Sequence, residues 1–85
     1  MSVSVQVRYF AALREALGEG EAVSLPSGST VGDVRRHLMA CDARHAQALD
    51  LGRAVRCALN HTLCQESAPL VEGAEVAFFP PVTGG

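Results

Sequence analysis

Hydrophobic and polar residues alternate at the start of the chain, in the run VSVQVRYF over residues 3–10. The apolar members of one parity are Val3, Val5, Val7 and Tyr9. Such a period of two is typical of a strand with one buried face. Phe10 falls on the polar parity, so we expect either that the strand ends there or that this ring lies on the outside.

The spacing of apolar residues and turn formers predicts the remaining elements. We expect a short helix over 11–18, a strand over 22–26, a main helix from 31 to about 41, a second helical stretch over 44–51, a strand over 54–60, a short extended piece at 63–64 and a last strand over 75–79. The main helix has apolar residues at three- and four-residue spacing. Thr30 is its expected N-cap, with Asp33 three residues on.

The first and last strands are the most apolar, so we expect them to lie side by side at the centre of the sheet. In the last strand Val76 and Phe78 share the inward parity, which predicts that Phe79 projects outward. This order of elements predicts an α+β fold, a mixed sheet of four to five strands over one main helix. The architecture is a ubiquitin-like β-grasp, with residues 1–79 as one domain.

Size and charge exclude several classes of function. The 85 residues make one small domain with no room for a deep pocket, so any chemistry should occur at an edge with a partner. A net charge of -2 offers no basic patch, so we expect no nucleic-acid partner. No apolar run approaches about 20 residues, so we expect no membrane partner and a cytoplasmic location.

The cysteines are poor candidates for a nucleophile. Cys57 has the inward parity of its strand and is interpreted as a small buried hydrophobe. Cys41 is expected at a helix C-terminus, which lacks the positive helix end that lowers a thiol pKa. Cys64 lies three residues from His61, a weak signal without a third, orienting group. We therefore expect no cysteine enzyme.

The other titratable residues do not gather into a site. The three histidines and the carboxylates are scattered, so we expect no metal site. A group of glutamates is expected to form a solvated acidic rim that could also orient a partner: Glu15, Glu19 and Glu21.

The chain ends on FFPPVTGG. Pro80 and Pro81 have no backbone N–H, so the sheet ladder stops and residues 80–85 should leave it as an extended tail. Gly84 and Gly85 add no side-chain width, which makes a thin tip with a carboxylate at its end. A frayed end is the alternative, but an exposed Phe79 at the base of an aimed tail favours a contact site.

Three stretches carry a family resemblance: VRYFAALREALG, ALNHTL and PLVEGAEVAFFPPVTGG. The whole chain resembles the small subunit of molybdopterin synthase, the MoaD-type sulfur carriers of molybdenum cofactor biosynthesis. The resemblance implies a carrier and not a stand-alone enzyme. An adenylating partner, similar to ubiquitin-activating enzymes, would use ATP and Mg to activate the terminal carboxylate, while this chain alone binds no cofactor. Sulfur would then replace AMP and leave a thiocarboxylate.

The resemblance also assigns a partner and residue roles. The loaded tail would enter the large subunit of molybdopterin synthase, in a heterotetramer, and pass sulfur to cyclic pyranopterin monophosphate. Gly85 would bear the thiocarboxylate, and Arg14 would meet an acidic residue of the activating enzyme. The tail residues that pass into the partner would be Pro80, Pro81, Val82, Thr83 and Gly84. The apolar patch that contacts both partners would be Phe10, Leu63 and Phe79.

Two other functions share the fold and the Gly-Gly end. One is a thiazole-forming sulfur carrier for thiamine, to which FFPPVTGG is less similar. The other is a ubiquitin-like protein modifier. Because the chain has no lysine, it cannot build isopeptide-linked chains on itself, which disfavours polymeric tagging but not single conjugation.

Overall fold

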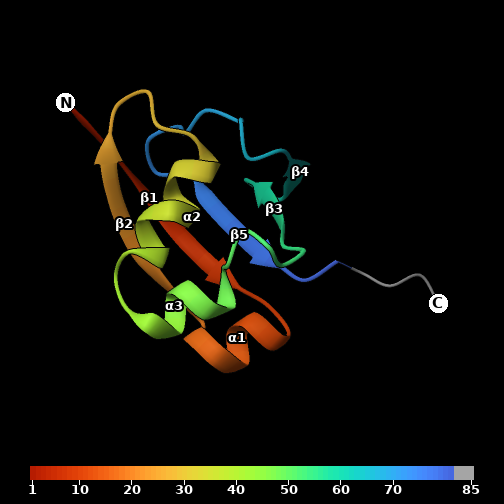
Figure 1. Cartoon of the computed structure of the whole chain (residues 1–85). Coiled ribbons are helices and arrows are strands. Elements are labelled where there is room, and N and C mark those ends of the chain that lie inside the picture. Colours follow the sequence, from red (N-terminus) through yellow and green to blue (C-terminus); the bar gives the residue numbers. More distant parts are fainter. Residues whose placement is uncertain (82–85) are drawn as a thin grey trace.

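The computed structural model describes residues 1–81, which form a five-stranded sheet and three helices (Figure 1). The strands are β1 (Ser2–Tyr9), β2 (Gly20–Pro26), β3 (Arg56–Leu59), β4 (Thr62–Cys64) and β5 (Glu75–Phe79). The helices are α1 (Ala12–Leu17), α2 (Val31–Met39) and α3 (Ala43–Ala48).

The sheet has the order β2-β1-β5-β3-β4. β1 and β5 are parallel neighbours at the centre, and the other pairs are antiparallel. The expectation that the first and last strands lie side by side is confirmed. Their register places Val7 opposite Val76, and both side chains are fully buried.

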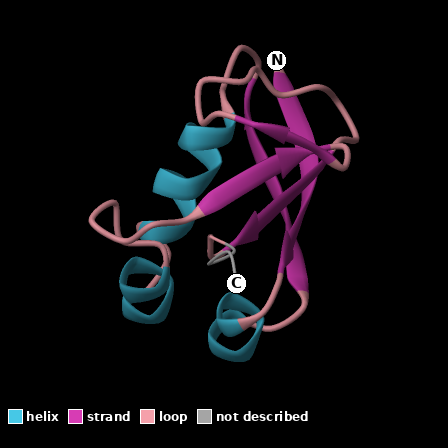
Figure 2. Cartoon of the chain, turned by 90° about the vertical axis from the view of Figure 1, so that its right-hand side faces the viewer, coloured by secondary structure: helices cyan, strands magenta, loops and turns pink. Residues whose placement is uncertain are grey.

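The helices cover one face of the sheet (Figures 1 and 2). α2 lies across the middle of that face, whereas α1 and α3 contact each other near the end where β1 and β5 finish. The core lies between these layers, and its largest side chains are Tyr9, Phe78, Leu38, Leu49, Val7, Val31, Val34 and Val76. The α+β architecture with one main helix is therefore the one observed.

Several element ends differ from those predicted. α2 begins at the predicted capping box, in which the Asp33 N–H donates to Thr30 Oγ1 and the Thr30 N–H donates to an Asp33 carboxylate oxygen. It ends at Met39, because Asp42 is extended and accepts the His45 N–H as the N-cap of α3. α3 consequently spans fewer residues than the predicted 44–51.

β2 and β3, which precede and follow α2 and α3 along the chain, also differ in length from the predicted strands. β2 begins at Gly20, two residues before the predicted start, and a Cβ there would lie 2.1 Å from the Val7 carbonyl oxygen. Only glycine fits this close approach of two backbones. β3 is confined to Arg56–Leu59, shorter than the predicted 54–60.

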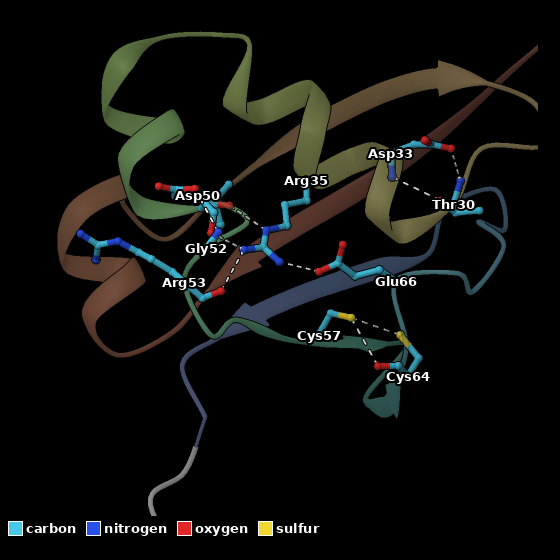
Figure 3. A network of polar contacts seen from close by, with 10 residues as sticks. Thr30, Asp33, Arg35, Asp50, Gly52, Arg53, Cys57, Cys64 and Glu66 are labelled. Carbon is cyan, nitrogen blue, oxygen red and sulfur yellow. Dashed lines mark hydrogen bonds and ion pairs between the residues drawn. The ribbon is translucent and has the colours of Figure 1, made fainter.

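Arg35, which no local sequence pattern indicates as a core residue, is buried with an exposed fraction of 3% (Figure 3). Its guanidinium donates to the carbonyl oxygens of Leu49, Asp50 and Arg53 and pairs with Glu66. A guanidinium that is always charged needs such partners when it is buried. Arg35 thereby joins α2 to the loop between α3 and β3 and to the segment after β4.

Candidate functional site

An apolar groove lies on the sheet face opposite the helices, at the point where the chain leaves β5. Its volume is about 610 Å³. The groove is lined by Phe10, Ala11, Ala58, His61, Leu63, Glu75, Ala77, Phe79, Pro80 and Pro81. The lining therefore combines side chains from three strands, from the loop after β1 and from the start of the tail.

The strand register explains why this face is hollow. Ala77 of β5 lies opposite Ala58 of β3, which in turn lies opposite Leu63 of β4. The two alanines are buried and their small side chains form the floor. Leu63, whose side chain is larger, forms the wall at the edge, and Phe79 lies two residues beyond Ala77 along β5. The groove is thus a consequence of small residues placed between large ones.

The structure brings the three predicted patch residues together in this groove. Leu63 is 67% exposed and Phe10 is 43% exposed. Phe79 projects to the predicted face. Its side chain is half-buried, not fully exposed, because it lies among the other groove residues. The groove continues onto Pro80 and Pro81, so the apolar patch and the base of the tail form one surface.

The position of Phe10 follows from the sharp change of backbone direction between β1 and α1. β1 ends at Tyr9, and the Phe10 N–H still donates to the Phe78 carbonyl oxygen at 3.2 Å. The Phe10 carbonyl oxygen then accepts the N–H groups of Leu13 and Arg14 in the first turn of α1. Between them Ala11 has φ 55° and ψ -131°, outside the regions that L-residues favour. Hydrogen bonds of the N–H and of the carbonyl oxygen of Phe10 therefore fix the backbone on both sides of its ring.

A polar rim closes one end of the groove. His61 Nε2 lies 3.4 Å from a carboxylate oxygen of Glu75, and Arg8 lies 4.0 Å from the other. Asn60 and His61 form the two-residue turn between β3 and β4 and both have positive φ. The sequence pattern did not indicate His61 and Glu75 as groove residues, because only the register of β3, β4 and β5 brings them together.

Arg14 lies outside the groove lining, next to it on α1. It is exposed and pairs with Glu19 at 2.9 Å. Glu21 was expected in a solvated acidic rim, and for this residue the expectation is wrong. Its side chain is half-buried and accepts hydrogen bonds from Tyr9 Oη at 2.8 Å and from His45 Nε2 at 2.7 Å. Burial raises the pKa of Tyr9, and the hydrogen bond to Glu21 adds to the shift.

The expectation that Cys57 is a buried hydrophobe is confirmed. Its exposed fraction is 4%, and burial, with the hydrogen bond to Cys64, raises the pKa of its thiol to about 12. Cys64 Sγ contacts Cys57 Sγ, whereas His61 Nε2 lies next to the Glu75 carboxylate. The structure therefore does not pair Cys64 with His61. Within residues 1–81, no group of three or more His, Cys, Asp or Glu side chains could hold a metal ion.

Two further expectations concern membrane-spanning segments and the C-terminal tail. No helix in the described part of the chain is long and apolar enough to cross a membrane. Four of the predicted tail residues lie outside the described residues: Val82, Thr83, Gly84 and Gly85. The described part of the tail is therefore its base, Pro80 and Pro81.

Comparison with known proteins gives the family. The model of the ThiS family matches residues 7–85, so the match includes the tail. A molybdopterin synthase sulfur carrier subunit from Escherichia coli is 42% identical over 81 residues, which cover 95% of this chain and 99% of that protein.

Two solved structures share the fold at lower identity. The first is a complex of subunits 1 and 2 of molybdopterin-converting factor from Helicobacter pylori, with a chain of 26% identity and a TM-score of 0.65 that covers 98% of this chain and 100% of that one. The second is SAMP1 from Haloferax volcanii, with 27% identity and a TM-score of 0.75, covering 96% and 99% respectively. The chain therefore belongs to the ThiS family, in the group whose curated members are molybdopterin synthase sulfur carrier subunits.

Proposed function

We propose that this protein is the sulfur-carrying small subunit of a molybdopterin synthase. Gly85 is adenylated and converted to a thiocarboxylate, which donates sulfur to cyclic pyranopterin monophosphate to form molybdopterin. The observation that carries the proposal is the 42% identity to a sulfur carrier subunit over nearly the whole chain. It is supported by the apolar groove, which lies at the base of the tail that would bear the sulfur.

The chemistry explains why a carrier needs a partner. A carboxylate is a poor electrophile, so one of its oxygens first attacks the α-phosphorus of ATP and pyrophosphate leaves. Hydrosulfide, or a donor that delivers sulfur at the same oxidation level, then attacks the acyl carbon, and AMP leaves. The adenylating partner would supply ATP and Mg for the first of these steps. The thiocarboxylate formed is a sulfur nucleophile that is ionised at neutral pH.

The groove would serve both partners in turn. Its wall residue Leu63 and its half-exposed Phe10 are large apolar groups that cost solubility unless a partner covers them. Contact at this surface holds the diproline, and hence the direction of the tail, relative to the partner's active site. Arg14 lies outside the groove and is exposed, so an acidic residue of the activating enzyme could compete with Glu19 for its guanidinium. The large subunit would bind the same surface in a heterotetramer.

Reconstitution tests the proposal. The protein is loaded by its activating enzyme with ATP, Mg and a sulfur source, and is then mixed with the large subunit and cyclic pyranopterin monophosphate. We expect molybdopterin to form while the terminal sulfur is lost from the carrier. A loaded carrier that keeps its sulfur under these conditions contradicts the proposal.

The same experiment separates the two alternatives. The similarity to SAMP1, a small archaeal modifier protein, is the observation in favour of a protein modifier. A modifier would give high-mass adducts that only peptidases release. A thiazole-forming carrier would lose its sulfur to the thiazole-forming system and not to the pterin precursor.

A further inference from the structure

Cys57 and Cys64 face each other across the β3–β4 hairpin, on the helix side of the sheet (Figure 3). They are register partners, and their sulfur atoms lie 3.8 Å apart. The Cys57 thiol also donates to the Cys64 carbonyl oxygen at 3.4 Å. Neither cysteine belongs to the apolar groove, which is on the opposite face, so the sulfur carrier function proposed above leaves this pair unused.

The strand register gives Cys57 and Cys64 a Cα separation at which disulfides occur. Directly opposed residues of an antiparallel pair have Cα atoms about 4.5–5.5 Å apart. Disulfides occur at Cα separations of about 4.4–6.8 Å. The Cβ atoms of such a pair, about 4.5–5.5 Å apart, must approach to about 3.5–4.5 Å. Rotation of the side chains, with a small approach of the short edge strand β4 to β3, closes the remaining gap.

We propose that Cys57 and Cys64 form a reversible disulfide between β3 and β4 when the protein meets a low-molecular-weight disulfide. Cys64 reacts first, because it is half-buried on the edge strand β4, whereas Cys57 is 4% exposed. The bond ties down a three-residue edge strand that, within residues 1–81, pairs with β3 alone. That strand also carries Leu63, the wall of the apolar groove.

The reaction is two thiol–disulfide exchanges. The Cys64 thiolate attacks one sulfur of the oxidant, and the other sulfur leaves as a thiolate. Cys57 loses its proton to solvent and attacks Cys64 Sγ, and the second thiolate leaves. The two protein thiols lose two electrons and two protons, and the oxidant is reduced to two thiols. Since burial raises the pKa of Cys57, the second exchange should be faster at alkaline pH.

Intact-mass measurement with oxidised glutathione as the oxidant tests the bond. A Cys41→Ser background removes the exposed third thiol, which could otherwise join two chains. In native, mildly alkaline buffer we expect this protein to lose the mass of two hydrogens and both free thiols, and to recover both on reduction. A glutathione adduct that persists at equilibrium, a covalent dimer or an unchanged mass would overturn the proposal.

Matched variants and a stability measurement make the test specific. In the same background, Cys57→Ala or Cys64→Ala should abolish the mass loss; Cys64 is half-buried, so its variant remains informative if Cys57→Ala does not fold. Bond formation should be at least ~10-fold slower in concentrated urea, since strand pairing holds the sulfurs together. The oxidised protein should have a Tm higher by roughly 5 °C or more. Equal rates with and without urea, or an unchanged Tm, would contradict the inference.

Discussion

Ala11 carries backbone strain at the rim of the apolar groove. Its φ of 55° and ψ of -131° suit glycine and cost an L-residue about 1–3 kcal/mol. Ala11→Gly relieves this strain but adds flexibility to the unfolded chain, which costs about 0.4–1 kcal/mol. We therefore expect the variant to be about 1 kcal/mol more stable in urea unfolding. Ala12→Gly, at the first residue of α1, is the control: this residue has no positive φ to relieve, so the variant should not be stabilising.

Arg35 is the single charged side chain that is fully buried among the described residues. Arg35→Ala leaves Glu66 and three carbonyl oxygens without their shared donor, so we expect a loss of about 3–5 kcal/mol in the free energy of unfolding. Arg36→Ala is the neighbouring control: its guanidinium is exposed, and the change should be within about 0.5 kcal/mol. Equal losses for the two variants would show that the buried network contributes nothing.

At the scale of elements, His45 connects α3 to β2 and makes stability depend on pH. Its Nδ1 lies 2.8 Å from Asp42 and its Nε2 lies 2.7 Å from Glu21. Only the protonated imidazole can donate from both nitrogens. Burial lowers the pKa of His45, but the hydrogen bonds and charges of Asp42 and Glu21 outweigh it, so the net shift is upward from 6.5.

The sign of this shift predicts the alkaline side of the stability profile. A raised pKa in the folded state means that the contribution is complete below about pH 6.5 and is lost as the pH rises through the folded pKa. Urea unfolding from pH 6 to 9 should therefore show falling stability, and His45→Gln should flatten the profile. His37→Gln, which removes an exposed histidine of α2, should leave the fall in place. A profile that is unchanged in His45→Gln would refute this assignment.

Asp42 acts in the opposite direction. The backbone N–H of His45, followed by the His45 ring, holds the pKa of Asp42 below its usual value. Its contribution is therefore present above about pH 4 and is lost as the pH falls further. Together the two groups predict maximum stability between about pH 4 and 6.5 for this end of the fold.

Most of the elements could be predicted from the sequence because period-two and helical spacing are local signals. β5 has the predicted bounds, and the α2 N-cap is where Thr30 and Asp33 indicated. The missed features are contacts between elements. Arg35 bonds to Leu49 and Glu66, 14 and 31 residues away, and no local pattern reports which loops meet α2. The Cys57–Cys64 contact depends on the register of the β3–β4 hairpin.

The candidate site was also predictable only where strand parity, a local signal, assigns a residue to one face of the sheet. The parity of the last strand was enough to assign Phe79 to the face opposite the core, whereas for Phe10 it left either a strand end or an outward ring. It could not predict that Phe79 is half-buried, because that depends on which parts of β3 and of the loop after β1 lie next to β5. Leu63 came from the family resemblance alone, and the structure places it on the same groove.

At the scale of the whole molecule, the groove can be tested apart from the fold. Leu63→Arg puts a charge on a wall residue that is already 67% exposed, so stability should change by less than about 1 kcal/mol. Binding to the large subunit should nevertheless fall by at least about 100-fold in titration calorimetry, because an apolar contact is replaced by a buried charge. Leu63→Arg tests this more cleanly than Phe79→Arg, since Phe79 also packs within the groove.

Val71→Arg is the matched control for the groove. Val71 is a large apolar residue of similar exposure, 58%, and it does not line the groove. We expect this variant to bind the large subunit as the unmodified protein does. Equal binding by both arginine variants would show that the groove is not the contact surface.

The central claim, that the folded domain carries sulfur on one terminal carboxylate, is tested most directly by intact mass. The protein is incubated with its activating enzyme, ATP, Mg and a sulfur source, beside a variant with one residue added after Gly85. We predict that the unmodified protein gains the mass of one oxygen replaced by sulfur at Gly85, and that the extended variant, equally stable, gains nothing. An unchanged mass for the unmodified protein, or sulfur on the extended variant, would contradict the account.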